Sequence, residues 1–393
     1  MQLPVSILAF GTFFALALPT PPPLRSQYLT TELPGSQATL HQFYKEETWK
    51  SDVADIPSTH AIFNGMKEKD TFTAIVMPNS KTSIRGPAGA PGTLRQTPLD
   101  YVKNAATPND NFIFTNGGFF INSPASEKYG YSIGPLLHKE TKPENIRTEK
   151  IPAQYAKDYK KLVGDDGTYL WSGPQLKEWT RKIEHEARFQ YWDNKPDPKT
   201  TKTPKTAFTR IPGNLAHSSQ RNERLALVEA TYQRAGKPVA VKIVFAYTTN
   251  DRHRGGVTIF ELRELIQKFL MQFIDGLTLE RTELAMNLDG GGSVFVGLQS
   301  RGTTYAIVGG SQKDTPVRLG LRSPGELKYA VRAVTNFVRH DLAPSPAGDT
   351  AGKSRSPSPG GRSPSTGGSR SPSSGSAVRG RGTGTPARSG RRR

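Results

Sequence analysis

Short runs of β-branched and aromatic residues, separated by turn residues, constrain the fold of this chain more than any other feature. There are seven of them, at residues 71–77, 111–115, 224–231, 239–248, 284–288, 294–298 and 303–308. Runs of this length and composition are typical of β-strands. Many strands with few helices favour the α+β class. We therefore expect an α+β fold, mainly a β-sheet domain with a few helices packed on it.

One segment has the periodicity of an amphipathic helix. Apolar residues recur at helical spacing from Thr258 onward, at Ile259, Leu262, Leu265, Ile266, Phe269, Leu270 and Phe273. Thr258 and Glu261 have the spacing of a capping box, and Gly276 is expected to end the helix. Residues 174–191 could form a second, shorter helix, and residues 324–334 could hold another.

The N-terminus has the pattern of a secretory leader. The apolar run Val5 to Leu18 is too short to cross a bilayer but long enough for a signal-peptide core, and prolines 21–23 follow it. We expect residues 1–26 to be a signal peptide with a Pro-rich spacer, no transmembrane segment, and a secreted or cell-envelope protein. The alternative is a disordered apolar N-terminus.

The net charge of +19 is distributed unevenly along the chain. From Ala343 onward there are one Lys and nine Arg against one Asp, a net of +9, so the preceding residues carry +10. Residues 343–393 contain few large apolar side chains, and we expect a disordered basic tail. Such a tail could contact polyanions or could simply improve solubility. The expected folded domain is 27–342, in which the polar stretch from about 139 to 205 resembles an insertion.

Several chemistries have no support in the sequence. The chain contains no cysteine, which excludes disulfides, thiolate metal sites and cysteine nucleophiles. It also lacks the His-Glu-x-x-His, EF-hand and phosphate-binding-loop patterns. We therefore expect neither a metal nor another cofactor. The sequence does not indicate an oligomeric state.

Two glycine-rich turns interrupt otherwise apolar strands. The first is Asn116-Gly117-Gly118, which two phenylalanines follow, and the second runs from Asp289 through three glycines to Ser293. Three consecutive glycines cost much backbone entropy on folding, and a simple hairpin needs only one or two. This pattern favours a turn pressed against a ligand, with Asp289 at its edge.

In this order, the two turns resemble the phosphodiester glycosidase family. That family includes the lysosomal uncovering enzyme, which removes N-acetylglucosamine from phosphomannose. The shared pattern also contains Arg224 on a strand, the helix that begins near Thr258, and an Arg-x-Val-x-Asn segment from Arg332 to Asn336. The resemblance covers roughly residues 60–340. The chain departs from the family at Leu225, where Thr is usual, and at Val294, where Ser or Thr is common.

The resemblance implies a secreted hydrolase that cleaves a glycosyl phosphodiester or a related glycan linkage. A leaving phosphate ester needs little protonation, so one carboxylate can suffice where ordinary glycosidases need two. Asp289 would be the general base or nucleophile at the anomeric carbon, and Arg224 would pair with phosphate oxygens. Backbone N–H groups of both glycine turns would hold substrate oxygens. The expected substrate contacts are Asn116, Gly117, Gly118, Phe119, Asn287, Gly290, Gly291, Gly292, Ser293 and Asn336.

Each role has a structural alternative. Arg224 could be an ion-pair partner, Asn116 could supply a turn conformation, and Asp289 could cap the glycine turn. Glu261 is interpreted as a helix cap rather than a catalytic acid. For the whole protein, the alternatives are an inactive protein that binds an anionic polysaccharide and a polyanion-binding protein that acts through its tail.

Overall fold

The computed structural model describes eleven stretches of the chain and a few single positions between 121 and 128. The stretches are 26–46, 57–87, 94–120, 129–138, 148–149, 160–184 without Pro174, 220–250, 255–273, 278–309, 319–327 and 331–345. Most of the predicted leader and of the basic tail therefore lies outside the described residues. Within them, no helix is long and apolar enough to cross a membrane.

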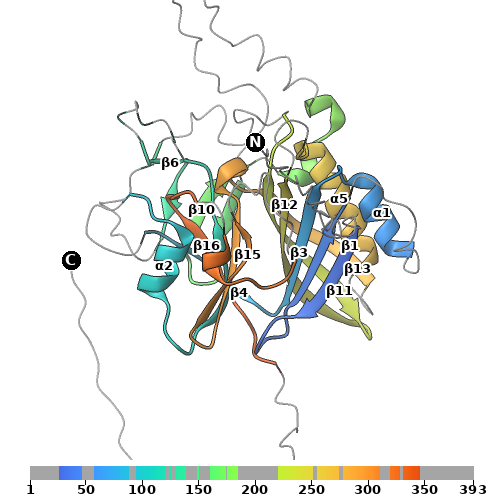
Figure 1. Cartoon of the computed structure of the whole chain (residues 1–393), viewed down its shortest axis with the longest axis horizontal. Helices are drawn as coiled ribbons and strands as arrows, with labels where there is room; N and C mark the ends of the chain where they lie inside the picture. Colours follow the sequence, from blue (N-terminus) through green and yellow to red (C-terminus); the bar gives the residue numbers. More distant parts are fainter. Residues whose placement is uncertain are drawn as a thin grey trace, which may run out of the picture. The chain divides into compact units, whose positions relative to one another are not determined.

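The larger sheet has six antiparallel strands in the order β1-β2-β3-β12-β11-β13 (Figure 1). Their bounds are Gln27–Glu32 (β1), Thr39–Tyr44 (β2), Asp70–Pro78 (β3), Arg224–Arg234 (β11), Lys237–Thr249 (β12) and Thr278–Asn287 (β13). Strands β11 and β12 form a hairpin through Ala235 and Gly236, whose φ angles are 49° and 75°. Two consecutive positive φ angles match the twist of a two-residue hairpin turn.

A second sheet has five antiparallel strands in the order β15-β14-β5-β16-β4. Their bounds are Lys81–Arg85 (β4), Asn111–Asn116 (β5), Phe295–Ser300 (β14), Thr303–Gly309 (β15) and Phe337–Asp341 (β16). Two small sheets accompany it, one of β7 (Leu136–Leu137), β10 (Tyr169–Ser172) and β9 (Lys160–Val163), the other of β6 (Ser132–Ile133) and β8 (Thr148–Glu149). All seven predicted runs coincide with strands. Five of them match the strand bounds to within two residues, whereas β11 extends three residues further and β13 begins six residues earlier than predicted.

The two large sheets pack face to face, and helices cover their outer faces (Figure 1). Helices α1 (Pro57–Gly65) and α5 (Ile259–Gln272) lie on the six-stranded sheet, and α2 (Pro98–Ala105) lies on the five-stranded sheet. The alternation of side chains along β11 explains why both faces of this sheet are covered. Leu225 and Leu227 enter the core between the sheets, while Ala226 and Val228 face the helical side. The layers are therefore α–β–β–α, which confirms the predicted α+β, mainly β class.

Helix α5 forms as the sequence predicts. The N–H of Glu261 donates to Thr258 Oγ1 at 3.2 Å, and the N–H of Thr258 donates to Glu261 Oε2 at 3.0 Å, which completes the capping box. All seven apolar positions of the predicted stripe are buried against the sheet. The helix ends at Gln272, and Gly276 lies outside the described residues.

The prediction of a helix at 324–334 is wrong. Residues Pro324–Glu326 form a single 3₁₀ turn, which a hydrogen bond from the N–H of Ser323 to Glu326 Oε1 (3.1 Å) closes. Beyond it, Val334 exchanges two backbone hydrogen bonds with Gln96, of 3.0 and 2.9 Å. This extended pairing takes the backbone groups that a helix would need.

The described part of the polar stretch 139–205 is packed into the domain. Strands β9 and β10 lie within it, and Leu162, Leu170, Leu176 and Trp179 are buried in the two cores. The possible helix at 174–191 is described only in part, as a 3₁₀ turn at Leu176–Glu178 and a helical turn at 181–184. At least this portion of the stretch is structural rather than a surface addition.

Candidate functional site

The segment that carries Asp289 links the two large sheets. Strand β13 of the larger sheet ends at Asn287, and strand β14 of the smaller sheet begins at Phe295. The connection includes a 3₁₀ turn at Gly291–Ser293. Asp289 therefore lies where the ends of the two sheets meet, close to the first residues of β11 and the last residues of β5.

Three backbone hydrogen bonds fix this connection to both sheets. The N–H of Leu288 donates to the Leu225 carbonyl at 2.8 Å, and the N–H of Gly291 donates to the Glu223 carbonyl at 2.9 Å, both at the start of β11. The N–H of Asp289 donates to the Gly117 carbonyl at 3.0 Å, just beyond β5. The two glycine turns predicted from the sequence are therefore in direct contact.

The Asn116 side chain bridges the same two turns. Its Nδ2 donates to the Asp289 carbonyl at 2.8 Å, and its Oδ1 accepts from the N–H of Phe295 at 2.9 Å. Asn116 is fully buried. Because both ends of the amide hold backbone, its geometry favours positioning of the Asp289 turn over direct contact with a sugar.

Asn336 fills the place expected for a substrate oxygen at the first glycine turn. The N–H of Gly117 donates to the Asn336 carbonyl at 2.9 Å, and the N–H of Gly118 donates to Asn336 Oδ1 at 2.7 Å. Our expectation that these two N–H groups hold substrate oxygens is thus not supported, since Asn336, at the entry to β16, already accepts from both. The Nδ2 of Asn336 has no acceptor among the described residues.

Substitution of Gly117 by Ala is expected to destabilise the protein. A Cβ atom there would lie 2.0 Å from Oδ1 of the buried Asn336, so the amide and both of its contacts must shift. We expect a loss of about 1–3 kcal/mol in the free energy of unfolding, measured by urea denaturation. Gly118→Ala is the matched control, because its Cβ would have no neighbour closer than 3.4 Å. Equal losses for both variants would contradict this account.

Contacts within the protein and backbone conformation constrain the triple glycine, most strongly at Gly290 and Gly291. A Cβ at Gly290 would lie 2.6 Å from the Glu223 carbonyl oxygen, and one at Gly292 would lie 2.8 Å from Arg332 Nη2. Gly291 has a φ of 59°, in the left-handed region. We predicted close approach to a ligand. The structure shows close approach to the start of β11 and to an arginine side chain, and the approach to a ligand stays a prediction.

Asp289 is only partly exposed, and its surroundings perturb its titration. Burial raises the pKa of Asp289 to about 6. The Ser293 hydroxyl, the charge of Arg332, the N–H of Gly290 and the charge of Arg224 act in the opposite direction. The carboxyl group is therefore ionised at neutral pH but accepts a proton under mildly acidic conditions.

Arg224 lies behind Asp289 in the interior. Its Nη2 donates to the Gln220 carbonyl at 2.6 Å and its Nε donates to the Val257 carbonyl at 3.2 Å. Burial lowers its pKa to about 10, against the opposing charges of Glu184 and Asp289. These contacts agree with the structural alternative, in which the guanidinium holds backbone and balances nearby carboxylates.

Arg332 is a site residue that our assignment of roles missed. Its Nη1 donates to Ser293 Oγ at 3.2 Å, and its charge acts on Asp289. Unlike Arg224, the residue is exposed. The signal was present in the Arg-x-Val-x-Asn segment, but sequence alone does not place this segment against the glycine turn.

The remaining predicted residues surround this centre. The backbone carbonyl of Asn287 accepts from Ser172 Oγ at 3.0 Å, and the side-chain Nδ2 of Asn287 donates to the Leu288 carbonyl at 2.8 Å. Phe119 is partly exposed, and its carbonyl accepts from the N–H of Ile133 at 2.8 Å. Strand β10 closes one side, because a Cβ at Gly118 would contact Leu170, Trp171 and Ser172.

The described residues contain no group of three His, Asp or Glu side chains able to hold a metal ion. The chain matches no protein-family model, and it matches no curated protein at a significant level. Fold and site together define an antiparallel α–β–β–α protein. Its two sheets are linked by a turn that presents one half-buried carboxylate, with a hydroxyl and two guanidinium groups around it.

Proposed function

We propose that this protein is a hydrolase that cleaves a glycosyl phosphodiester, with Asp289 as its reacting carboxylate. One observation carries the proposal. The two glycine turns that resemble the phosphodiester glycosidase family converge on Asp289, although 173 positions separate Asn116 from it in the chain. Secretion through residues 1–26 belongs to the same proposal and stays a prediction.

The reaction needs a carboxylate that is ionised but basic. Asp289 either attacks the anomeric carbon and forms a glycosyl ester that water then hydrolyses, or accepts the proton of a water molecule that attacks this carbon. The C–O bond to phosphorus-bound oxygen breaks, and its electron pair leaves with the phosphate ester. A pKa near 6 suits a base that works near neutral pH.

Charged and polar neighbours support this role. The Ser293 hydroxyl interacts with Asp289, and its oxygen accepts from Arg332, so the three side chains form a chain of contacts. The exposed guanidinium of Arg332 would pair with the phosphate oxygens of the substrate, since its planar donors match phosphate geometry. Arg224 would stabilise the ionised form of Asp289 from behind.

The leaving group explains why one carboxylate is enough. A phosphate ester leaves as a weakly basic anion and needs little protonation at the bond that breaks. Ordinary glycosidases need a second carboxyl group for that step. In this protein Glu261 is occupied by the capping box of α5 and by an ion pair with Arg221, which favours a site built around Asp289 alone.

The test is release of free sugar from a panel of sugar 1-(methyl phosphates) by the purified full chain, between pH 4.5 and 8. We expect the rate to rise with pH and to reach half its plateau near pH 6, because Asp289 must lose its proton before it can act. A rate that is flat below pH 7 would argue against Asp289 as base or nucleophile. No release from any member of the panel would instead favour a glycan-binding protein.

A further inference from the structure

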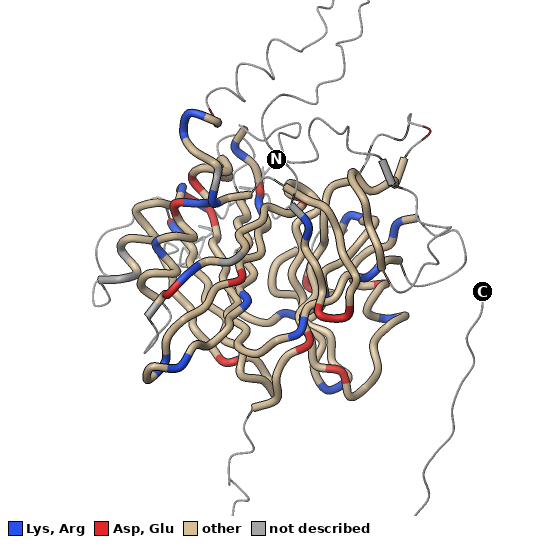
Figure 2. The backbone as a smooth tube through the Cα atoms, turned by 180° about the vertical axis from the view of Figure 1, so that it is seen from behind, with Lys and Arg blue, Asp and Glu red and all other residues tan. Residues whose placement is uncertain are grey.

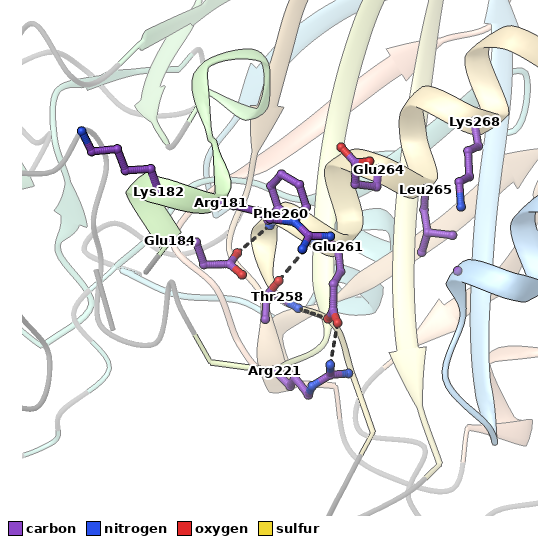
Figure 3. Close-up of a pocket in the computed structure, with 11 residues that line it drawn as sticks. Arg181, Lys182, Glu184, Arg221, Thr258, Phe260, Glu261, Glu264, Leu265 and Lys268 are labelled. Atoms are coloured by element: carbon purple, nitrogen blue, oxygen red, sulfur yellow. Dashed lines mark hydrogen bonds and ion pairs between the residues drawn. The ribbon is translucent and has the colours of Figure 1, made fainter. Parts of the chain in front are cut away.

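A cleft lies over the first turns of α5. Its volume is about 970 Å³. Arg181, Lys182 and Glu184 line it from the helical turn at 181–184, and Arg221 lines it from the segment before β11 (Figure 3). The other lining residues are Gly65, Thr258, Phe260, Glu261, Glu264, Leu265 and Lys268.

The glutamates nearest the start of α5 are already engaged. Glu184 Oε2 accepts from the N–H of Phe260 at 2.8 Å and from the Trp179 indole at 3.2 Å. Glu261 completes the capping box and pairs with Arg221 at 2.5 Å. The N–H groups of Phe260 and Glu261 at the start of α5 therefore already have side-chain acceptors, and these two groups are not what would attract a ligand to the cleft.

The charges of the lining are positive on balance. The lining carries a surplus of one positive charge, from Arg181, Lys182, Arg221 and Lys268 against Glu184, Glu261 and Glu264. Two of these glutamates also face other cations, since Glu261 pairs with Arg221 and Glu184 interacts with the charge of Arg224. Figure 3 shows Arg181 beside the Phe260 ring, 5.0 Å from its centroid, while Lys182 extends outward at the rim. Basic and acidic positions are otherwise interspersed over the described backbone (Figure 2). A local excess of cations in a cleft attracts anions.

One short segment connects the cleft to the Asp289 turn. Arg221 lines the cleft, and its neighbour Asn222 lies beside Gly291, where a Cβ would be 3.3 Å from Asn222 Nδ2. The carbonyl of Glu223 then accepts from the N–H of Gly291. The charge of Arg224 interacts with those of both Glu184 and Asp289. Glu223 and Arg224 are buried, whereas Arg221, Asn222 and Gly291 are at least partly exposed, so a substrate that extends beyond the reacting bond can reach the cleft over these three residues.

We propose that this cleft is a second anion-binding subsite, which takes a further phosphate group on the leaving side of the substrate. The inference rests on the proposed function. It narrows the substrate class to glycosyl esters whose leaving group carries negative charge beyond the reacting phosphodiester. Arg181 and Lys268 bind that second phosphate, and neither belongs to the catalytic site at Asp289.

The test compares two substrates with the same sugar, a sugar 1-(methyl phosphate) and the corresponding methyl diphosphate. In the full chain, R181Q/K268Q is expected to lower kcat/KM for the diphosphate roughly tenfold, because two charged hydrogen bonds are lost. The rate for the methyl phosphate should stay within about twofold. R234Q/K237Q is the matched control, since it removes two charges from the exposed β11–β12 hairpin, at the opposite end of β11 from Arg224.

Calorimetric binding of inorganic pyrophosphate to the same three proteins separates this inference from the proposed function. Weaker binding in R181Q/K268Q alone supports the cleft as a phosphate site, even if no substrate is turned over. The basic tail is identical in all three proteins and cannot produce this difference. Equal pyrophosphate binding, or equal losses of kcat/KM on both substrates, would overturn the proposal.

Discussion

Asp289→Asn is expected to lower the rate of sugar release by about 10²–10⁴-fold, the range attributed to a single general acid–base group. The amide has nearly the same shape but cannot accept a proton or attack carbon. The turn itself should persist, because the backbone hydrogen bonds of Asp289 with Gly117 and with the Asn116 side chain do not involve the carboxyl group. Sugar release on the panel of methyl phosphates measures the effect. Equal release by both proteins would remove Asp289 from the mechanism.

The stability of the same variant gives an independent control. Burial raises the pKa of Asp289 above its unfolded value of 3.8, to about 6. The contribution of protonated Asp289 to the free energy of unfolding is thus fully present below about pH 3.8 and is lost as the pH rises through 6. Asn does not titrate, so the variant should gain in free energy of unfolding relative to the parent between pH 4.5 and 7.5. Urea denaturation of both proteins at pH 4.5 and pH 7.5 measures this difference in the free energy of unfolding. The same experiment shows whether an inactive variant is folded.

Phe269→Ala is expected to cost about 3–5 kcal/mol in the free energy of unfolding, the largest stability effect that we predict. Phe269 is fully buried on α5. Its ring contacts five others at centroid distances of 5.2–6.5 Å, those of His41, Phe43, Phe72, Phe245 and Phe273. Removal of the ring leaves a cavity between the helix and three strands, because the neighbouring rings belong to separate elements and cannot all move inward.

Met271→Ala on the same helix is the control. Met271 is 78% exposed, two positions from Phe269, and its replacement changes little buried surface. Its cost should stay within about 0.5 kcal/mol. Urea denaturation of both variants gives the comparison. A similar cost at the two positions would mean that α5 contributes mainly through its own helical propensity, and not through the aromatic cluster.

The elements with strong local patterns could be predicted from the sequence. Helix α5 carries both a complete apolar stripe and a capping box, so its start and its buried face follow from local rules. Helix α1, in contrast, has only nine residues and no comparable stripe, and the sequence analysis did not find it. The helix predicted at 324–334 failed because Val334 pairs with Gln96, which is remote in the chain.

The candidate site was predictable as a set of residues but not as a geometry. The sequence placed Asn116 and Asp289 in one site, and the structure joins them. The partners of Gly117 and Gly118 were missed, because the register of β16 against β5 decides that Asn336 faces them. Arg332, in the segment before β16, contacts Ser293. No local pattern encodes a pairing between strands more than 200 positions apart.

The connection between β13 and β14 has a consequence for folding. Asp289 belongs to a turn whose anchors come from the larger sheet on one side and from the smaller sheet on the other. Neither sheet alone holds the turn, so the site forms only after the two have docked. Non-local pairings of this kind form slowly. The proposed sugar release would therefore appear last during refolding, after the native β-sheet content, and its delay would report on the docking of the two sheets.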